Sequence, residues 1–260
     1  MEVLLSSGCL YKDPLEKTFY ISASCGFDGV EVILNDIYYK SDIEDRLREL
    51  NKISKIKAFH APFNATSSKE RIAAIKRSVE LAQKLNIPTV IFHPPLKLFF
   101  DFSYWKWFRN GVGALPQKPT PCVENMPYIK IGPFRINLFC IHKFSDLKRL
   151  TEEKRLKIAF DTTHCGTSGI DLIEAFEELG GTETIHHIHL SDLRIEGSDF
   201  IEHVFPGEGE LEIFEFLHYL RKVRYNKSIS IEVSPKFLPK DDREKITKLR
   251  KLLQKIRSIL

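Results

Sequence analysis

The chain has no long apolar run, no large excess of charge of one sign and no closely paired cysteines. None of its apolar stretches approaches the roughly 20 residues that a membrane-spanning helix needs, so we expect no membrane partner. Lys and Arg number 39 against 35 for Asp and Glu, a balance that permits an anionic partner without requiring one. The five cysteines are odd in number and irregularly spaced, which indicates reduced thiols and a cytoplasmic protein.

A signal peptide and a flexible linker are also absent from the sequence. The opening residues, MEVLLSSGCLYKDP, lack the basic region and the long apolar region of a secretory signal. No Gly/Ser-rich stretch divides the 260 residues, and this length is close to the roughly 250 typical of one (β/α)8 barrel. With 43% hydrophobic residues, the chain can bury a large core. We therefore predict a single domain over residues 1–260.

Short apolar runs of β type alternate with segments of helical periodicity. The predicted strands lie near Val3–Ser6, Gly29–Leu34, Ile56–His60, Thr89–His93, Cys122–Glu124, Lys157–Asp161, Ile185–Leu190 and Ile229–Val233. The predicted helices lie near 14–24, 41–52, 68–86, 98–113, 145–153, 170–179, 210–222 and 240–259. Eight such units favour a (β/α)8 TIM barrel. A doubly wound open sheet is the competing architecture, but it would collect ligands at one switch point.

Two segments stand apart from this pattern. Pro127–Phe144, with its prolines and apolar residues, predicts a long irregular loop that could act as a lid. The aromatic segment LFFDFSYWKWF, residues 98–108, predicts a helix that packs on the barrel. The alternatives for this segment are a homodimer contact or a wall of a substrate pocket.

Residues of metal-ligand type recur once per repeat, at intervals of 28 to 43 residues. They are His60, His93, Glu124, Asp161, His189 and Glu232. Most of them end or directly follow an apolar run, and the carboxyl ends of barrel strands meet at one mouth. The sequence therefore predicts a ring of chelating groups. Carboxylates combined with imidazole suit Mn²⁺, Zn²⁺, Co²⁺ or Mg²⁺ rather than a thiolate-selecting metal.

Further histidines extend this prediction to as many as three ions. His60 and His93 would form a second site bridged by Glu124, while His164 and His203 could add more ligands. His187 shares an interior face with His189, which predicts either a role beside the metal ligands or plain packing. His186 should point outward.

Eight motifs in order along the chain resemble the xylose isomerase-like TIM-barrel superfamily, which includes sugar isomerases and epimerases and the endonuclease IV-type apurinic endonucleases. The motifs are GFDGVEVIL, FHAPF, IFHPP, CVENMP, FDTTHCGTSGID, HIHLSD, HVFPGEGEL and ISIEVSP. The resemblance implies a catalytic metal on Glu124, Asp161, His189 and Glu232. In the endonuclease branch it implies four further ligands, His60, His93, His164 and His203. That branch also has an Asp two residues before the last His, and Ile201 occupies this position here unless Asp199 or Glu202 substitutes.

The hypothesis that the sequence favours is a divalent-metal-dependent isomerase or epimerase acting on a sugar, sugar phosphate or related polyol. The metal would stabilise an enediolate, with Glu124 and Glu232 as the acid/base pair. Arg194 and Lys236 would bind a substrate hydroxyl or phosphate; the alternative for both is a surface charge.

Two other functions stay open at this stage. One is an endonuclease IV-like phosphodiesterase that cleaves DNA at abasic sites, which the extra histidines favour. The opening LLSSGCLYKD and the segment NDIYYKSD lack the motifs expected of that branch, and the weak net charge offers little attraction for phosphates. The other is a binding or regulatory barrel with a vestigial site, against which the near-complete ligand set argues.

Overall fold

The computed structural model describes residues 1–260 except 36–41, 66, 98–101, 133 and 198. Eight parallel strands close into a barrel in the order β1-β12-β9-β8-β5-β4-β3-β2. Their bounds are β1 (Glu2–Ser6), β2 (Gly29–Ile33), β3 (Ile56–His60), β4 (Thr89–Phe92), β5 (Thr120–Glu124), β8 (Lys157–Asp161), β9 (Ile185–Leu190) and β12 (Ser228–Ile231). The predicted TIM barrel is confirmed, and each predicted strand falls within two residues of an observed one.

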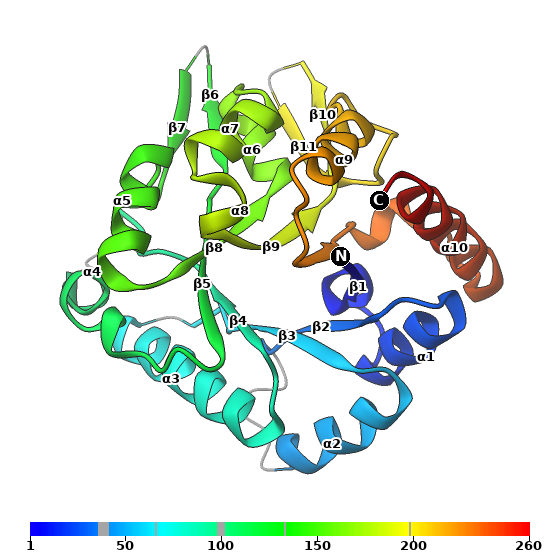
Figure 1. Ribbon diagram of the computed structural model, residues 1–260, viewed down its shortest axis with the longest axis horizontal. Coiled ribbons are helices and arrows are strands. Elements are labelled where there is room, and N and C mark those ends of the chain that lie inside the picture. Colours follow the sequence, from blue (N-terminus) through cyan, green and yellow to red (C-terminus); the bar gives the residue numbers. More distant parts are fainter. Residues whose placement is uncertain (36–41, 66, 98–101, 133, 198) are drawn as a thin grey trace.

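Helices surround the barrel, as Figure 1 shows. They are α1 (Leu15–Cys25), α2 (Ile43–Ile53), α3 (Ser68–Leu85), α4 (Phe102–Asn110), α5 (Phe144–Lys154), α6 (Thr162–Ser168), α7 (Leu172–Glu178), α8 (Gly181–Thr184), α9 (Ile213–Lys222) and α10 (Asp242–Ile259). In the described part of the chain, three 3₁₀ turns lie between a strand and a helix: η1 (Ser7–Leu10), η2 (Val112–Ala114) and η3 (Pro235–Phe237). The first part of the aromatic segment, residues 98–101, lies outside the described residues. Its second part forms α4, where Phe108 packs on Phe92 of β4 with ring centroids 6.2 Å apart.

Helix α3 illustrates how the sequence fixes an outer helix. The Ser67 hydroxyl accepts from the Glu70 backbone N–H, and the Glu70 carboxylate accepts from the Ser67 N–H, so a capping box starts the helix. Ile75 and Val79 bury its inner face against the barrel. Asn86 ends it in the left-handed conformation, with φ 55°.

Part of the barrel interior is lined by four small or apolar residues, each followed two positions later by a polar one. Because side chains alternate along a strand, residues two apart point to the same side of the sheet. The small or apolar residues Ala58, Ile91, Cys122 and Ala159 form a separate interior cluster, and they precede His60, His93, Glu124 and Asp161 in that order. This phase aims the polar side chains into the barrel mouth.

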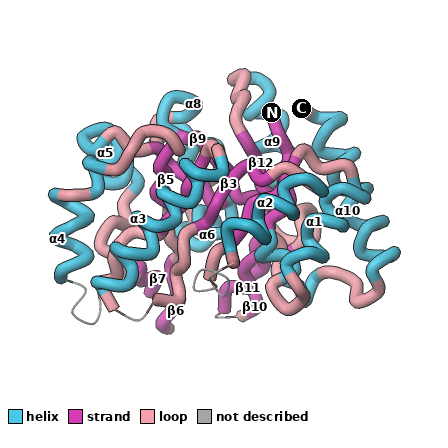
Figure 2. The backbone as a smooth tube through the Cα atoms, turned by 90° about the horizontal axis from the view of Figure 1, so that it is seen from below, coloured by secondary structure: helices cyan, strands magenta, loops and turns pink. Residues whose placement is uncertain are grey.

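Two β-hairpins project from the same end of the barrel, opposite the chain termini (Figure 2). Strands β6 (Tyr128–Ile131) and β7 (Phe134–Asn137) form one, and β10 (Asp192–Glu196) and β11 (Asp199–Val204) form the other. The first hairpin occupies the segment predicted as an irregular loop, so that prediction of irregularity was wrong. The two hairpins meet where Lys130 Nζ lies 4.8 Å from the centroid of the Phe200 ring.

Candidate metal centre

The six predicted ring residues converge at the carboxyl ends of their strands. Nε2 of His60 and Nε2 of His93 each lie 3.1 Å from Glu124 Oε2. His189 Nδ1 lies 3.1 Å from Glu124 Oε1 and 3.2 Å from Glu232 Oε2. The same nitrogen lies 3.7 Å from Asp161 Oδ2. The structure therefore brings all six side chains together, with Glu124 and His189 at the centre.

The two remaining histidines join the ring from neighbouring elements. Asp161 caps helix α6 by accepting from the His164 backbone N–H at 2.7 Å, which sets His164 beside it. His203 lies on β11, and its ring centroid is 5.6 Å from that of His164. His203 Nδ1 also lies 3.2 Å from Ser191 Oγ. Its φ of 54° is uncommon for a residue with a side chain.

The donor atoms of these residues suit divalent cations. Four groups of described residues each offer ligand atoms within 4.8 Å of one another: Glu124, Asp161 and His189; His60, His93 and Glu124; Asp161, His164 and His203; and Glu31, His187 and His189. Among the residues that the structure describes, the buried Asp161 Oδ2 has no hydrogen-bond partner, and such an orphaned oxygen is costly unless a cation satisfies it. His60 Nδ1 donates to the Ala61 carbonyl at 2.9 Å, which leaves Nε2 free to bind metal.

The two carboxyl groups next to His189 differ in protonation. Burial raises the pKa of Glu124, but the charges and hydrogen bonds of His189, His164 and His60 outweigh it and hold that pKa well below its usual range. Burial dominates at Glu232 and raises its pKa despite His189. The Glu232 side chain is 16% exposed, against 2% for Glu124. One carboxyl is therefore firmly ionised while its neighbour exchanges protons more readily.

The pKa values of two histidines in the ring are also shifted in opposite directions. Burial lowers the pKa of His93, and the contact with Glu124 offsets this only in part. Burial acts in the same direction on His164, but Asp161 and Glu124 outweigh it and raise the pKa of His164 to about 10. In the metal-free protein, His164 therefore acts as a counter-ion to the carboxylates.

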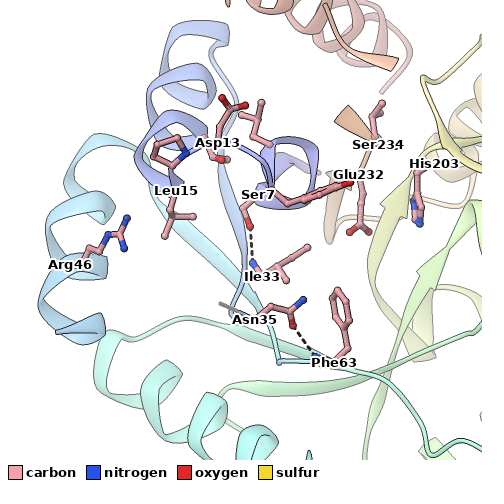
Figure 3. A pocket seen from close by; sticks show the side chains of 16 residues that line it. Ser7, Asp13, Leu15, Ile33, Asn35, Arg46, Phe63, His203, Glu232 and Ser234 are labelled. Atoms are coloured by element: carbon pink, nitrogen blue, oxygen red, sulfur yellow. Dashed lines mark hydrogen bonds between the residues drawn. The ribbon is translucent and has the colours of Figure 1, made fainter. Parts of the chain in front are cut away.

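A cavity of about 550 Å³ opens beside the ring. Glu232 and His203 line the cavity together with Arg46, Asn35 and Phe63. Figure 3 shows these and other side chains that line it. Its volume falls in the range of small-molecule sites. A ligand in the cavity would therefore meet the ring at Glu232.

The family follows from a comparison with known sequences. A family model described as xylose isomerase-like TIM barrel matches residues 19–256. The chain belongs to this family. Uncharacterized proteins of Mycobacterium bovis and Methanocaldococcus jannaschii are each 26% identical to it, over 90% and 89% of this chain and 89% and 83% of their own.

Solved structures show the same fold at lower identity. A D-tagatose 3-epimerase-like protein superposes with a TM-score of 0.74 at 22% identity, over 100% of this chain and 98% of its own. Endonuclease IV from Thermus thermophilus superposes with a TM-score of 0.68 at 16% identity, over 99% of this chain and 100% of its own. These similarities establish the fold that the xylose isomerase-like chain shares with both.

The residues predicted to bind substrate in this xylose isomerase-like barrel lie apart from the cavity. Arg194, on β10, donates to the Glu208 carbonyl at 3.0 Å. Lys236, in η3, is exposed and lies 4.8 Å from the Phe237 ring centroid. Neither is among the described residues that line the cavity, so their role in substrate binding stays a prediction. Arg46, which lines it, forms a 2.7 Å ion pair with Glu16.

Two buried residues of the site were missed by sequence reasoning. Glu31, on β2, places Oε2 2.7 Å from His187 Nε2 and 3.1 Å from His189 Nε2. Asn125 accepts from the Asp161 N–H at 2.7 Å and donates to the Asp161 carbonyl at 3.0 Å. The signal for Glu31 was a lone charge inside the apolar run GVEVIL, in phase with the barrel interior.

The position that Ile201 holds bears on a third metal site. Ile201 pairs with Arg194 across the β10–β11 hairpin, so an aliphatic side chain stands where the endonuclease branch would have an Asp. Asp199 lies opposite Glu196 at the turn end of the same hairpin. The charge of Glu202 contributes to the raised pKa of His164. Of the two proposed substitutes, Glu202 therefore has a charge that acts on His164.

No helix in the described part of this chain is both long and apolar enough to cross a bilayer.

Proposed function

We propose that the chain is a divalent-metal-dependent isomerase or epimerase acting on a sugar, sugar phosphate or related polyol. The observation that carries this proposal is the pair of carboxyl groups beside His189 Nδ1, Glu124 at 3.1 Å and Glu232 at 3.2 Å. Their pKa values are shifted in opposite directions. Two carboxyl groups with divergent pKa values are suited to remove a proton and to return one.

The chemistry follows from the positions of these two side chains. When bound, the cation would act as a Lewis acid toward a substrate carbonyl. One carboxylate takes the proton from the carbon next to that carbonyl, and the electron pair of the broken C–H bond moves into an enediolate. Return of a proton to the opposite face of that carbon gives an epimer, and return to the neighbouring carbon gives an isomer. Glu232, which lines the cavity, is the carboxyl placed to meet the substrate.

A second candidate function rests on the additional histidine groups. The His60, His93 and Glu124 group and the Asp161, His164 and His203 group offer ligands for further ions, and clustered metals suit phosphodiester hydrolysis at abasic sites in DNA. Ile201 and the net charge of +4 favour the first candidate over this one. The number of tightly bound ions bears on the choice, since three would favour the hydrolase.

The experiment that tests the proposal combines metal analysis with proton exchange. We expect purified protein soaked in Mn²⁺ or Zn²⁺ to retain at least one ion, and Glu232→Gln to retain less. We also expect loaded protein to incorporate deuterium from D₂O into a member of a panel of ketoses and ketose phosphates. Glu232→Gln should slow this incorporation by roughly 10²–10⁴-fold.

The matched control is Glu215→Gln, the same change at an exposed position on α9, which should leave both readings unchanged. An abasic-site DNA duplex is incubated in parallel. Strand scission without exchange into any sugar would replace the first candidate by the second, and a protein that retains no ion would contradict both.

A further inference from the structure

A polar layer lies beneath the metal-binding ring, inside the barrel. Glu31 and His187 are both fully buried, and Glu31 Oε2 lies 2.7 Å from His187 Nε2. The other nitrogen of His187, Nδ1, lies 2.7 Å from Ser228 Oγ. Strands β2, β9 and β12 therefore contribute one connected hydrogen-bond chain that ends at His189 Nε2.

The donor and acceptor capacities of these side chains fix where the protons lie in the hydrogen-bond network. An ionised carboxylate only accepts hydrogen bonds, so the Nε2 atoms of both histidines must donate to Glu31. His187 Nδ1 then accepts from the Ser228 hydroxyl. His189 is left with Nδ1 unprotonated when it is neutral, and Nδ1 is the atom that faces Glu124, Asp161 and Glu232.

We propose that Glu31 is a positioning residue that fixes the tautomer and ring orientation of His189, with His187 and Ser228 holding Glu31 in place. The inference rests on the metal centre of the proposed function and extends it to residues outside the ligand set. Burying a carboxylate costs several kcal/mol unless it is paired, and Ala58, which is in register with Glu31 on β3, belongs to an apolar interior cluster. A barrel core alone would not need a charge here, whereas a metal-binding imidazole is strengthened by one.

The test measures metal affinity in the whole protein. Dissociation constants for Zn²⁺ are obtained by chelator competition for the wild type, Glu31→Gln and Ser228→Ala, with Glu215→Gln as the matched surface control. We expect Glu31→Gln to weaken binding roughly 10–100-fold, Ser228→Ala to weaken it less, and Glu215→Gln to leave it unchanged. Equal affinities in wild type and Glu31→Gln would overturn the proposal, whatever the change in melting temperature.

A second measurement, made on the wild type by NMR, tests the proposal even if Glu31→Gln does not fold. In the Zn²⁺-loaded wild type, the ¹⁵N shifts of His189 should place the proton on Nε2 and the metal on Nδ1; the reverse assignment overturns the proposal. Absence of Zn²⁺ binding to the wild type overturns the metal centre and this inference together. An unreactive protein that still shows the predicted affinity loss would contradict the proposed reaction alone.

Discussion

The buried carboxyl groups at the barrel mouth and in the layer beneath it lie next to histidines. Glu31, Glu124 and Asp161 are at most 2% exposed, and no Lys or Arg of the described chain forms an ion pair with any of them. Imidazole is the side chain that can carry a proton here and give it up when a cation arrives. The same histidines can therefore balance the carboxylates as imidazolium ions when no metal is bound, and bind a cation when they are neutral.

If a cation replaces the protons on these histidines, metal binding should release protons into solution. The pKa of His164 is raised to about 10, so His164 is an imidazolium in the metal-free protein at about pH 8. The carboxylates of Glu31, Glu232 and Glu124 outweigh burial and raise the pKa of His189 well above its usual value, which favours its charged form. Metal ligands must be deprotonated, and we expect about one proton or more to leave per ion bound. Calorimetric titration in buffers of different ionisation enthalpy measures this number.

Two variants test whether His164 is a source of the released protons. His164→Gln should release fewer protons than the wild type, while His218→Gln, at an exposed position on α9, should release the same number. Heats that do not depend on the buffer would contradict the assigned charges.

At the scale of elements, the ends of strands and the starts of helices are where the site is built. Asp161 ends β8 and also caps α6. Its side chain therefore stabilises the start of the helix and also faces His189 in the ring. The helix start in turn places His164 three residues later on the same side. Ligand geometry at this corner depends on the local cap.

The cap of α3 gives a prediction about stability. Ser67→Ala removes the acceptor for the Glu70 N–H and should lower the free energy of unfolding by about 1 kcal/mol. Urea denaturation of the metal-loaded protein measures this loss. Ser67→Thr keeps the hydroxyl and should lose less; an equal loss in both variants would show that the capping box is not the cause.

The elements that could be predicted from the sequence are those with buried apolar faces. The barrel strands are short apolar runs and were located closely, whereas the hairpin β6–β7 was missed because its apolar residues face solvent. Ile129 pairs with Ile136, and Ile131 with Phe134, yet all four are exposed. The candidate ligands were located because most of them end or directly follow an apolar run, once per repeat, whereas Glu31 lies inside one. Glu31 was missed because its partner His187 lies 156 residues away.

At the scale of the whole molecule, the proposed ligands come from six barrel repeats, so a bound metal would connect most of the barrel strands. A ligand that binds the folded state alone stabilises it by about 2.7 kcal/mol at 100 times its dissociation constant. We therefore expect chelation to lower the melting temperature by roughly 5–10 °C, as measured by calorimetry with and without Zn²⁺. In Glu232→Gln the difference should shrink, and a wild type whose melting is insensitive to chelator would contradict the shared site.

The closure of the barrel has a consequence for when the site comes into being. Strand β12 completes the sheet by pairing with β1, with Leu5 opposite Ile231, and Glu232 is the next residue after β12. The last of the proposed ligands therefore directly follows the strand that joins the two ends of the sheet. A chain that stops short of β12, during synthesis or after cleavage, has neither a closed barrel nor its cavity-facing carboxylate. Under the proposed function, the site would therefore be assembled only after the last barrel strand has been made and has paired with β1.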